Sequence, residues 1–235
     1  MCSIIGCNFQ IENLDHVNHF LKFRGPDHTS IHTQEKWTFV QNLLSITGEF
    51  TPQPFVSKDG NIVCIFNGEI YNYDKFGDYK SDGECLIPLY EKYGFDFVKY
   101  LDGEFAILVA DFSKRIFLAS TDVFATKPLW IGKDGEKIMF SSYESALERS
   151  GFKFRHKLPA NKTVVIDLDT NKPVYNVGVY NFDLNQHKDT YDGWLDAWTE
   201  SIRKRTKNLR EQIFIGLSSG YDSGAIACEL QNQGV

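Results

Sequence analysis

The sequence predicts an α+β sandwich followed by the start of an α/β unit, and two observations lead to this prediction. Short runs rich in β-branched and aromatic residues, bounded by turns, dominate the chain up to Thr170, with few helical segments among them. Near the C-terminus, an apolar run, a loop of small residues and a helical segment follow one another. That order is typical of a parallel sheet with crossover helices.

The sandwich is expected to contain strands at 38–44, 62–66, 105–110, 115–119, 138–141 and 163–166, and helices at 84–93 and 144–150. Turn signals stand at 58–61 and 134–135. Residues 181–189 are polar and unpatterned, which indicates a linker between a first domain at 2–180 and a second at 190–235. The second begins with a helix whose apolar stripe comprises Tyr191, Trp194, Leu195, Trp198 and Ile202. An apolar strand at 213–217 and a helix at 223–233 follow.

Composition excludes several classes of function. The net charge of −6 provides no basic field for nucleic acid. No apolar run approaches the ~20 residues of a membrane span, and the N-terminus lacks a signal-peptide layout. Five scattered cysteines without a C-x-x-C pair indicate a reducing, cytoplasmic setting and no zinc site. His16 and His19 have no third ligand nearby, so no metal site is expected.

Cys2 is the first candidate for chemistry. Removal of the initiator methionine would leave it with a free α-amino group that titrates near pH 8. Such an amine can take the thiol proton directly or through water, so the nucleophile would carry its own base. Many chains begin Met-Cys by chance, and this feature alone is weak evidence.

Three further segments strengthen the case for a catalytic role of Cys2. Arg24–Asp27 (RGPD) forms a rigid turn, and Asn67–Asn72 (NGEIYN) follows an apolar strand. Ser81–Glu84 (SDGE) places a capping serine and acidic residues at the start of a helix. Each segment also has a purely structural interpretation, as an ordinary loop, turn or helix cap.

Together these segments resemble class II glutamine amidotransferases, and most closely the asparagine synthetases. The resemblance extends over essentially the whole chain, with six motifs in register. They are the N-terminal CSIIG, FRGPD, FNGEIYNY and SDGE, then LDGEFA at 101–106 and DVFATKPL at 122–129. FSS at 140–142 matches as well. The resemblance implies an N-terminal nucleophile αββα sandwich.

The resemblance also implies roles for individual residues. Cys2 attacks the glutamine amide, and the Asn67 side chain and the Gly68 backbone N–H stabilise the oxyanion. Glu69 and Asp82, together with Asn67, hold the amino end of glutamine. Arg24 supports the nucleophile loop rather than reacting.

A second resemblance lies at 217–224 (LSSGYDSG). A small-residue loop between a strand and a helix directs backbone N–H groups at an anion. It resembles the pyrophosphate-binding loop of ATP pyrophosphatases, which asparagine synthetases carry in their second domain. The resemblance assigns ATP contacts to Leu217, Ser218, Gly220, Asp222 and Ser223. It therefore implies ATP and Mg²⁺ as cofactors of a complete synthetase and none for the glutaminase.

Three positions depart from the family pattern. Leu43 stands where an arginine holds the glutamine α-carboxylate, which predicts weak glutamine binding. Thr121 replaces an arginine and Tyr143 a glutamate. The sequence also stops one strand and one helix into the second domain, so we expect this segment to be frayed or docked on a second polypeptide or a second copy, and the chain alone to make no asparagine.

The leading hypothesis is therefore a glutamine-hydrolysing domain that supplies ammonia for ATP-dependent conversion of aspartate to asparagine. Glutamine, ATP and aspartate would be its small-molecule partners. Two alternatives stay open. One is a ligase of the same architecture that amidates a different carboxylate. The other is a non-catalytic module that senses glutamine or binds a partner.

Overall fold

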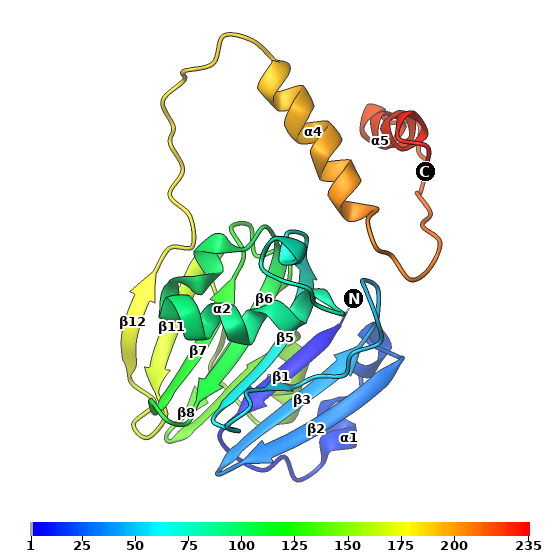
Figure 1. The fold of residues 1–235 in the computed structure, drawn as a ribbon. Coiled ribbons are helices and arrows are strands. Elements are labelled where there is room, and N and C mark those ends of the chain that lie inside the picture. Colours follow the sequence, from blue (N-terminus) through cyan, green and yellow to red (C-terminus); the bar gives the residue numbers. More distant parts are fainter. Residues whose placement is uncertain (1) are drawn as a thin grey trace. The chain divides into compact units, whose positions relative to one another are not determined.

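The computed structural model describes residues 2–235, which divide into two compact units. Of these residues, unit 1 comprises 2–45 and 49–181, and unit 2 comprises 46–48 and 182–235. Unit 1 contains two six-stranded sheets packed face to face, with helices on their outer faces (Figure 1). Every strand pair in these sheets is antiparallel.

The first sheet has the order β10-β8-β9-β1-β3-β2. Its strands are β1 (Ser3–Cys7), β2 (His28–Gln34), β3 (Trp37–Leu43), β8 (Trp130–Asp134), β9 (Lys137–Ser141) and β10 (Arg155–Lys157). The nucleophile candidate immediately precedes β1, a central strand that is buried along its whole length. Helices α1 (Leu14–Val17) and α3 (Glu144–Arg149) cover the outer face of this sheet. The core between them and the sheet includes Ile5, Val40 and Leu147.

The second sheet has the order β12-β11-β7-β6-β5-β4. Its strands are β4 (Phe55–Val56), β5 (Ile62–Ile70), β6 (Gly103–Asp111), β7 (Ile116–Thr121), β11 (Lys162–Asp167) and β12 (Pro173–Val177). Short 3-10 turns lie at Lys22–Arg24, Tyr73–Lys75, Asp82–Cys85 and Gly94–Tyr100. The last two flank α2 (Leu86–Tyr93), which covers the outer face of this sheet.

Alternation along β5 shows how one strand serves two cores. Cys64 and Phe66 face the helical side, whereas Val63 and Ile65 join the core between the sheets. That inner core is rich in stacked rings, with Trp37 and Phe117 centroids 4.4 Å apart. The α+β sandwich is thus confirmed, and all six expected strands of the first domain and both expected helices are present, with small shifts in their bounds. The turns at Gly60 and Gly135 have the positive φ that favours glycine.

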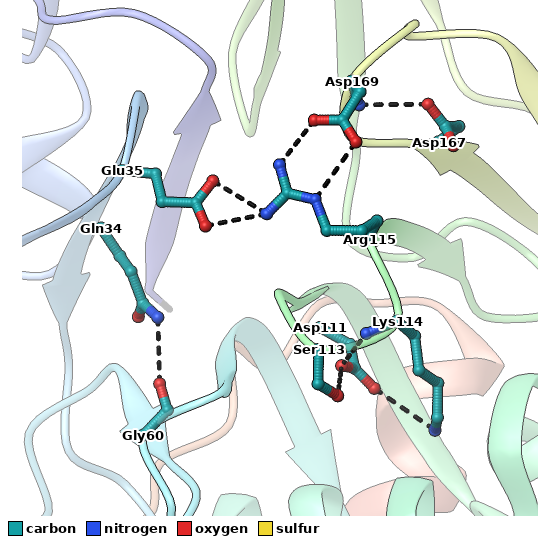
Figure 2. Close-up of polar contacts among 9 residues, drawn as sticks. All are labelled: Gln34, Glu35, Gly60, Asp111, Ser113, Lys114, Arg115, Asp167 and Asp169. Atoms are coloured by element: carbon teal, nitrogen blue, oxygen red, sulfur yellow. Dashed lines mark hydrogen bonds and ion pairs between the residues drawn. The ribbon is translucent and has the colours of Figure 1, made fainter.

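One ion-pair cluster connects turns of both sheets (Figure 2). Arg115, between β6 and β7, donates Nη1 to the Glu35 carboxylate at 2.8 and 2.9 Å and Nε to Asp169 at 3.2 Å. Glu35 lies in the β2–β3 turn and Asp169 between β11 and β12. Nearby, the Gln34 side chain donates to the Gly60 carbonyl at 3.0 Å. The Arg115–Glu35 and Gln34–Gly60 bonds join the β2–β3 end of the first sheet to turns of the second.

Unit 2 contains α4 (Asp192–Arg205) and α5 (Tyr221–Asn232). Its contacts include a β-bridge between Thr47 and Leu209 and a hydrogen bond from Gln233 Nε2 to the Thr199 carbonyl at 2.9 Å. The strand expected at 213–217 is not formed, and that prediction is wrong for the described chain. An isolated strand has no neighbour to satisfy its backbone groups. Of the stripe expected on α4, Ile202 alone is buried.

Candidate functional site

Cys2 lies in a close contact with the end of β3. Its Sγ accepts a hydrogen bond from the Leu44 N–H at 3.4 Å and lies 3.5 Å from the Leu44 carbonyl oxygen. The side chain is 7% exposed. Burial raises the pKa of the Cys2 thiol, and the nearby carboxylates of Glu69 and Asp82 raise it further. The thiol is therefore held protonated, and nucleophilic attack requires a base beside it.

The loop at Arg24–Asp27 holds Cys2 from the other side. Arg24 donates Nε to the Cys2 carbonyl at 3.1 Å and Nη1 to the Tyr143 hydroxyl at 2.9 Å. Gly25 packs on β3 so closely that a Cβ there would lie 2.1 Å from the Asn42 carbonyl oxygen. Any side chain at this position would push the loop away from the strand that contacts the thiol.

A buried polar network fixes the register of β1 against β3. Asn42 Nδ2 donates to Ser3 Oγ at 2.9 Å and to Asn18 Oδ1 at 2.8 Å. Asn18 Nδ2 donates back to Asn42 Oδ1 at 2.9 Å, and the Thr29 hydroxyl donates to the same oxygen. Satisfied buried networks of this kind specify one arrangement, because any shift leaves several groups unpaired. Sequence reasoning missed them, although a polar residue within an apolar strand was a usable signal.

Asn67 and Gly68 lie inside β5, which continues to Ile70, so the strand is longer than the predicted 62–66. Asn67 pairs with Ala106 and is fully buried, and neither amide atom of its side chain has a hydrogen-bond partner among the described residues. Only glycine fits at 68, since a Cβ would lie 2.1 Å from the Glu104 carbonyl oxygen. A buried, unpaired amide is a site that a ligand can complete.

Asp82 adds a buried carboxyl group. It begins the turn Asp82–Cys85, and its Oδ2 accepts a hydrogen bond from the Ile70 N–H at 2.8 Å. Burial raises the pKa of Asp82 well above its ordinary value, and the neighbouring Glu69 carboxylate raises it further. Ser81 precedes this turn, but its side chain makes no capping hydrogen bond, so the capping role expected for it is not observed. Two carboxyl groups that disfavour each other's charge provide a site for a cation.

A salt bridge between Lys127 and Glu104 lies next to these acids. Glu104 is the cross-strand partner of Glu69, and like charges at opposite positions disfavour a sheet. The buried Lys127 ammonium lies 3.0 Å from Glu104 Oε2, and the Tyr71 hydroxyl donates to Glu104 Oε1 at 2.8 Å. This cation reduces the repulsion between the two carboxylates. The sequence had linked the segments of Glu104 and Lys127 to a family without giving either residue a role.

Residues 1–173 match a family model described as a glutamine amidotransferase domain. The chain belongs to this family. The match covers the part of the sandwich that holds Cys2, Asn67 and Asp82 and all of its strands except β12. Mixed α/β architecture with two antiparallel sheets agrees with the N-terminal nucleophile fold expected for it.

Curated relatives are similar over part of their length. A probable asparagine synthetase (glutamine-hydrolyzing) of Dictyostelium discoideum is 36% identical over 149 residues, which cover 57% of this chain and 27% of that protein. A putative asparagine synthetase of Methanocaldococcus jannaschii is 30% identical over 217 residues, covering 81% of this chain and 39% of the relative. The chain thus spans less than half of each.

Solved structures support the fold. A glutamine phosphoribosylpyrophosphate amidotransferase from B. subtilis, complexed with ADP and GMP, superposes with a TM-score of 0.58 at 17% identity. The match covers 78% of this chain and 50% of that one. At this identity the likeness shows the shared fold alone.

The positions that depart from the family pattern have defined surroundings in the glutamine amidotransferase domain. Leu43 is buried, with 6% exposure, directly across from His28 of β2. The Thr121 hydroxyl donates to the Pro159 carbonyl at 2.7 Å. Tyr143 accepts from Arg24, whose guanidinium lies 5.2 Å from the centre of its ring. Tyr143 therefore contacts the arginine that hydrogen-bonds to the Cys2 carbonyl.

The loop expected to contact ATP lies in unit 2. Ser218 Oγ and Ser223 Oγ are 3.0 Å apart, and the Gly220 N–H donates to Ser218 Oγ at 3.1 Å. Gly220 caps α5, which begins at Tyr221, two residues earlier than predicted. Leu217 and Tyr221 are largely exposed.

Within residues 2–235, no group of three or more histidine, cysteine or acidic residues could hold a metal ion. No described helix combines the length and apolar character required to cross a membrane.

Proposed function

We propose that this chain hydrolyses glutamine through Cys2 and supplies the ammonia for ATP-dependent conversion of aspartate to asparagine. The observation that carries the first part is a buried thiol beside two carboxyl groups, on the same domain as an unpaired, fully buried Asn67 amide. The names of the relatives support the second part.

The proposed reaction begins with removal of Met1, which makes the α-amine of Cys2 available as the base. The thiolate attacks the side-chain amide carbon of glutamine, and the oxyanion accepts hydrogen bonds from Asn67 Nδ2 and the Gly68 N–H. Collapse breaks the C–N bond, the departing nitrogen takes the proton from the amine, and ammonia leaves. Water then hydrolyses the thioester to glutamate. Glu69 and Asp82 hold the substrate ammonium, and Arg24 positions Cys2.

The proposed second stage requires a complete synthetase domain. There, Leu217, Ser218, Gly220, Asp222 and Ser223 would contact ATP, with Mg²⁺ balancing the phosphate charge. In this proposal the chain has a glutamine-hydrolysing domain at 2–180, a linker at 181–189 and a synthetase segment at 190–235. A ligase that amidates another carboxylate would share the first stage, so acceptor competition between aspartate and other carboxylates separates the two.

The test of the first stage is glutamate and ammonia release from glutamine by the purified chain. We expect equal amounts of the two products, with no requirement for ATP. Binding of glutamine by calorimetry without any product would instead identify the chain as a non-catalytic glutamine-sensing module.

Glutamine binding is expected to tighten as pH rises. Because the raised pKa of Asp82 keeps its carboxyl protonated above the ordinary range, a bound ammonium must displace that proton. Binding below this pKa should therefore release protons, which calorimetry in buffers of different ionisation enthalpy measures. The raised pKa of Asp82 also affects the free energy of unfolding. Its contribution to stability is fully present below the pKa of Asp82 in the unfolded chain and is lost as pH rises through the raised pKa of the folded state.

Asp82→Asn should remove both the proton release and this gain in affinity, while the exposed Asp78→Asn should change neither. Equal proton release in the wild type and Asp82→Asn would contradict the role of Asp82.

Restoring a cation at position 43 is expected to tighten glutamine binding. A charge-assisted hydrogen bond to the α-carboxylate contributes ~1.5–3 kcal/mol, which corresponds to about 10–150-fold in affinity. Leu43→Arg should show this gain by calorimetry, and Leu43→Met, which keeps the side chain neutral, should not. A properly folded Leu43→Arg without any gain would mean that another group already binds the carboxylate.

A further inference from the structure

Among the described residues, four of the buried polar atoms that lack hydrogen-bond partners lie close together on one face of the first sheet. They are Ser30 Oγ, His32 Nε2, and both Oε1 and Nε2 of Gln41. Ser30 of β2 is the cross-strand partner of Gln41 of β3, and His32 is the partner of Phe39. Cross-strand partners point to the same face and lie within contact of each other. The three side chains are therefore neighbours.

This face looks into the space between the two sheets. Phe39, two residues from Gln41, packs in the inter-sheet core with Val63 and Ile65 of the second sheet. Since alternate residues of a strand share a face, Gln41 points the same way. Gln41 is fully buried, so bulk solvent does not reach its amide.

Contacts of β2 with residues outside the first sheet lie on either side of the cluster along that strand. Toward one end, Gln34 Nε2 donates to the Gly60 carbonyl at 3.0 Å. Toward the other, the rings of His28 and Phe50 meet edge to face with centroids 6.0 Å apart. Although β2 is the edge strand of its sheet, these atoms are buried on its inner face.

The chemistry of these atoms defines what can satisfy them. Gln41 provides two N–H donors and a carbonyl acceptor, Ser30 a hydroxyl that can do either, and His32 one ring nitrogen. None of them is a carboxylate, a lysine or an arginine. Their complement is a small neutral molecule that both donates and accepts hydrogen bonds. Buried waters play this part in proteins, making about three hydrogen bonds to groups that otherwise lack partners.

We propose that Ser30, His32 and Gln41 form an internal water-binding site between the two sheets. Gln41 is its central ligand because it provides two of the four unpaired atoms. The site adjoins the nucleophile strand, since Gln41 pairs with Ile4, two residues after Cys2. It is independent of the proposed reaction.

The direct test is nuclear magnetic resonance of the full chain, by magnetisation transfer from water to the Gln41 side-chain amide protons. We expect cross-peaks with the sign of a long-lived bound water, lost in Gln41→Met. Thr33→Ala, on the exposed face of β2, should leave them unchanged. Absence of these cross-peaks in the wild type would overturn the proposal.

Thermal unfolding provides a second test whose sign differs between a hydrated and a dry site. If water is bound, Gln41→Met lowers the melting temperature, because the water and Ser30 lose partners. If the site is dry, the substitution removes an unpaired buried amide, and the melting temperature is unchanged or rises. Ser30→Ala makes a smaller change in the same direction and serves if Gln41→Met fails to fold. An unchanged or raised melting temperature overturns the proposal.

Discussion

Replacing Cys2 by alanine is expected to abolish glutamine hydrolysis and leave the fold intact. Among the described residues, the hydrogen bonds of its thiol are weak contacts with the Leu44 backbone, so alanine loses little hydrogen bonding. Without the sulfur no thioester can form, and the remaining groups cannot replace a covalent step. Glutamate release by Cys2→Ala should fall to the background rate, with the melting temperature close to that of the wild type.

The same prediction can be checked by mass. A glutamine analogue that alkylates the nucleophile should add one label, on Cys2, in chains whose Met1 has been removed, and glutamine should protect against it. Cys7 and Cys85 are buried thiols whose pKa values are raised to about 12 by burial, so they should not react. The exposed Cys228→Ala is the matched control and should keep full labelling and activity. A label that glutamine prevents on any other cysteine would contradict the assignment of Cys2 as the nucleophile.

Asn67→Ala is expected to lower turnover about 100–1,000-fold, the usual cost of one lost oxyanion donor, with little change in the Michaelis constant. Its stability effect should be small, because neither amide atom of Asn67 has an internal partner to lose. The side chain is therefore positioned for a ligand at a cost to the free protein. Steady-state kinetics with thermal unfolding measures both effects.

Asn72→Ala is the matched control with the opposite signature. Its Nδ2 donates to the Tyr100 carbonyl and its Oδ1 accepts from the Asp102 N–H, both at 2.9 Å. Losing these bonds should lower stability by about 1–3 kcal/mol with turnover kept. If Asn67→Ala raised the Michaelis constant alone, Asn67 would bind the ground state and the oxyanion assignment would be wrong.

Local patterns predicted the elements whose residues have one dominant preference. Strands β3, β6, β7, β9 and β11 lie where β-branched and aromatic runs indicated them. Strand β2, among others, was not predicted, and β5 was predicted only as far as Phe66. β2 is an edge strand of mostly polar residues, held by pairing with β3, and a sheet partner is not visible in local sequence. β5 passes through Gly68 because tight packing against Glu104 requires a glycine there, although glycine ordinarily weakens a strand.

The wrong prediction at 213–217 has the opposite cause. An apolar run supplies the side chains of a buried strand, but a strand also requires a neighbour for its backbone groups. In the described chain that neighbour is not present, and Phe214 and Leu217 are exposed. The apolar residues at 213–217 are thus compatible with a buried strand, but without a neighbouring strand to pair with, the segment does not form one.

By itself the sequence determined the nature of the chemistry: a cysteine at position 2, motifs in the order of a family, and the candidate residues Asn67 and Asp82. Only the tertiary structure decided how these groups behave. Burial and neighbouring acidic groups raise the pKa values of Cys2 and Asp82, and the position of Asn67 in β5 buries its side-chain amide without a hydrogen-bond partner among the described residues. These properties depend on distances between residues far apart in the chain, because desolvation and charge act through space, and a linear pattern does not contain those distances.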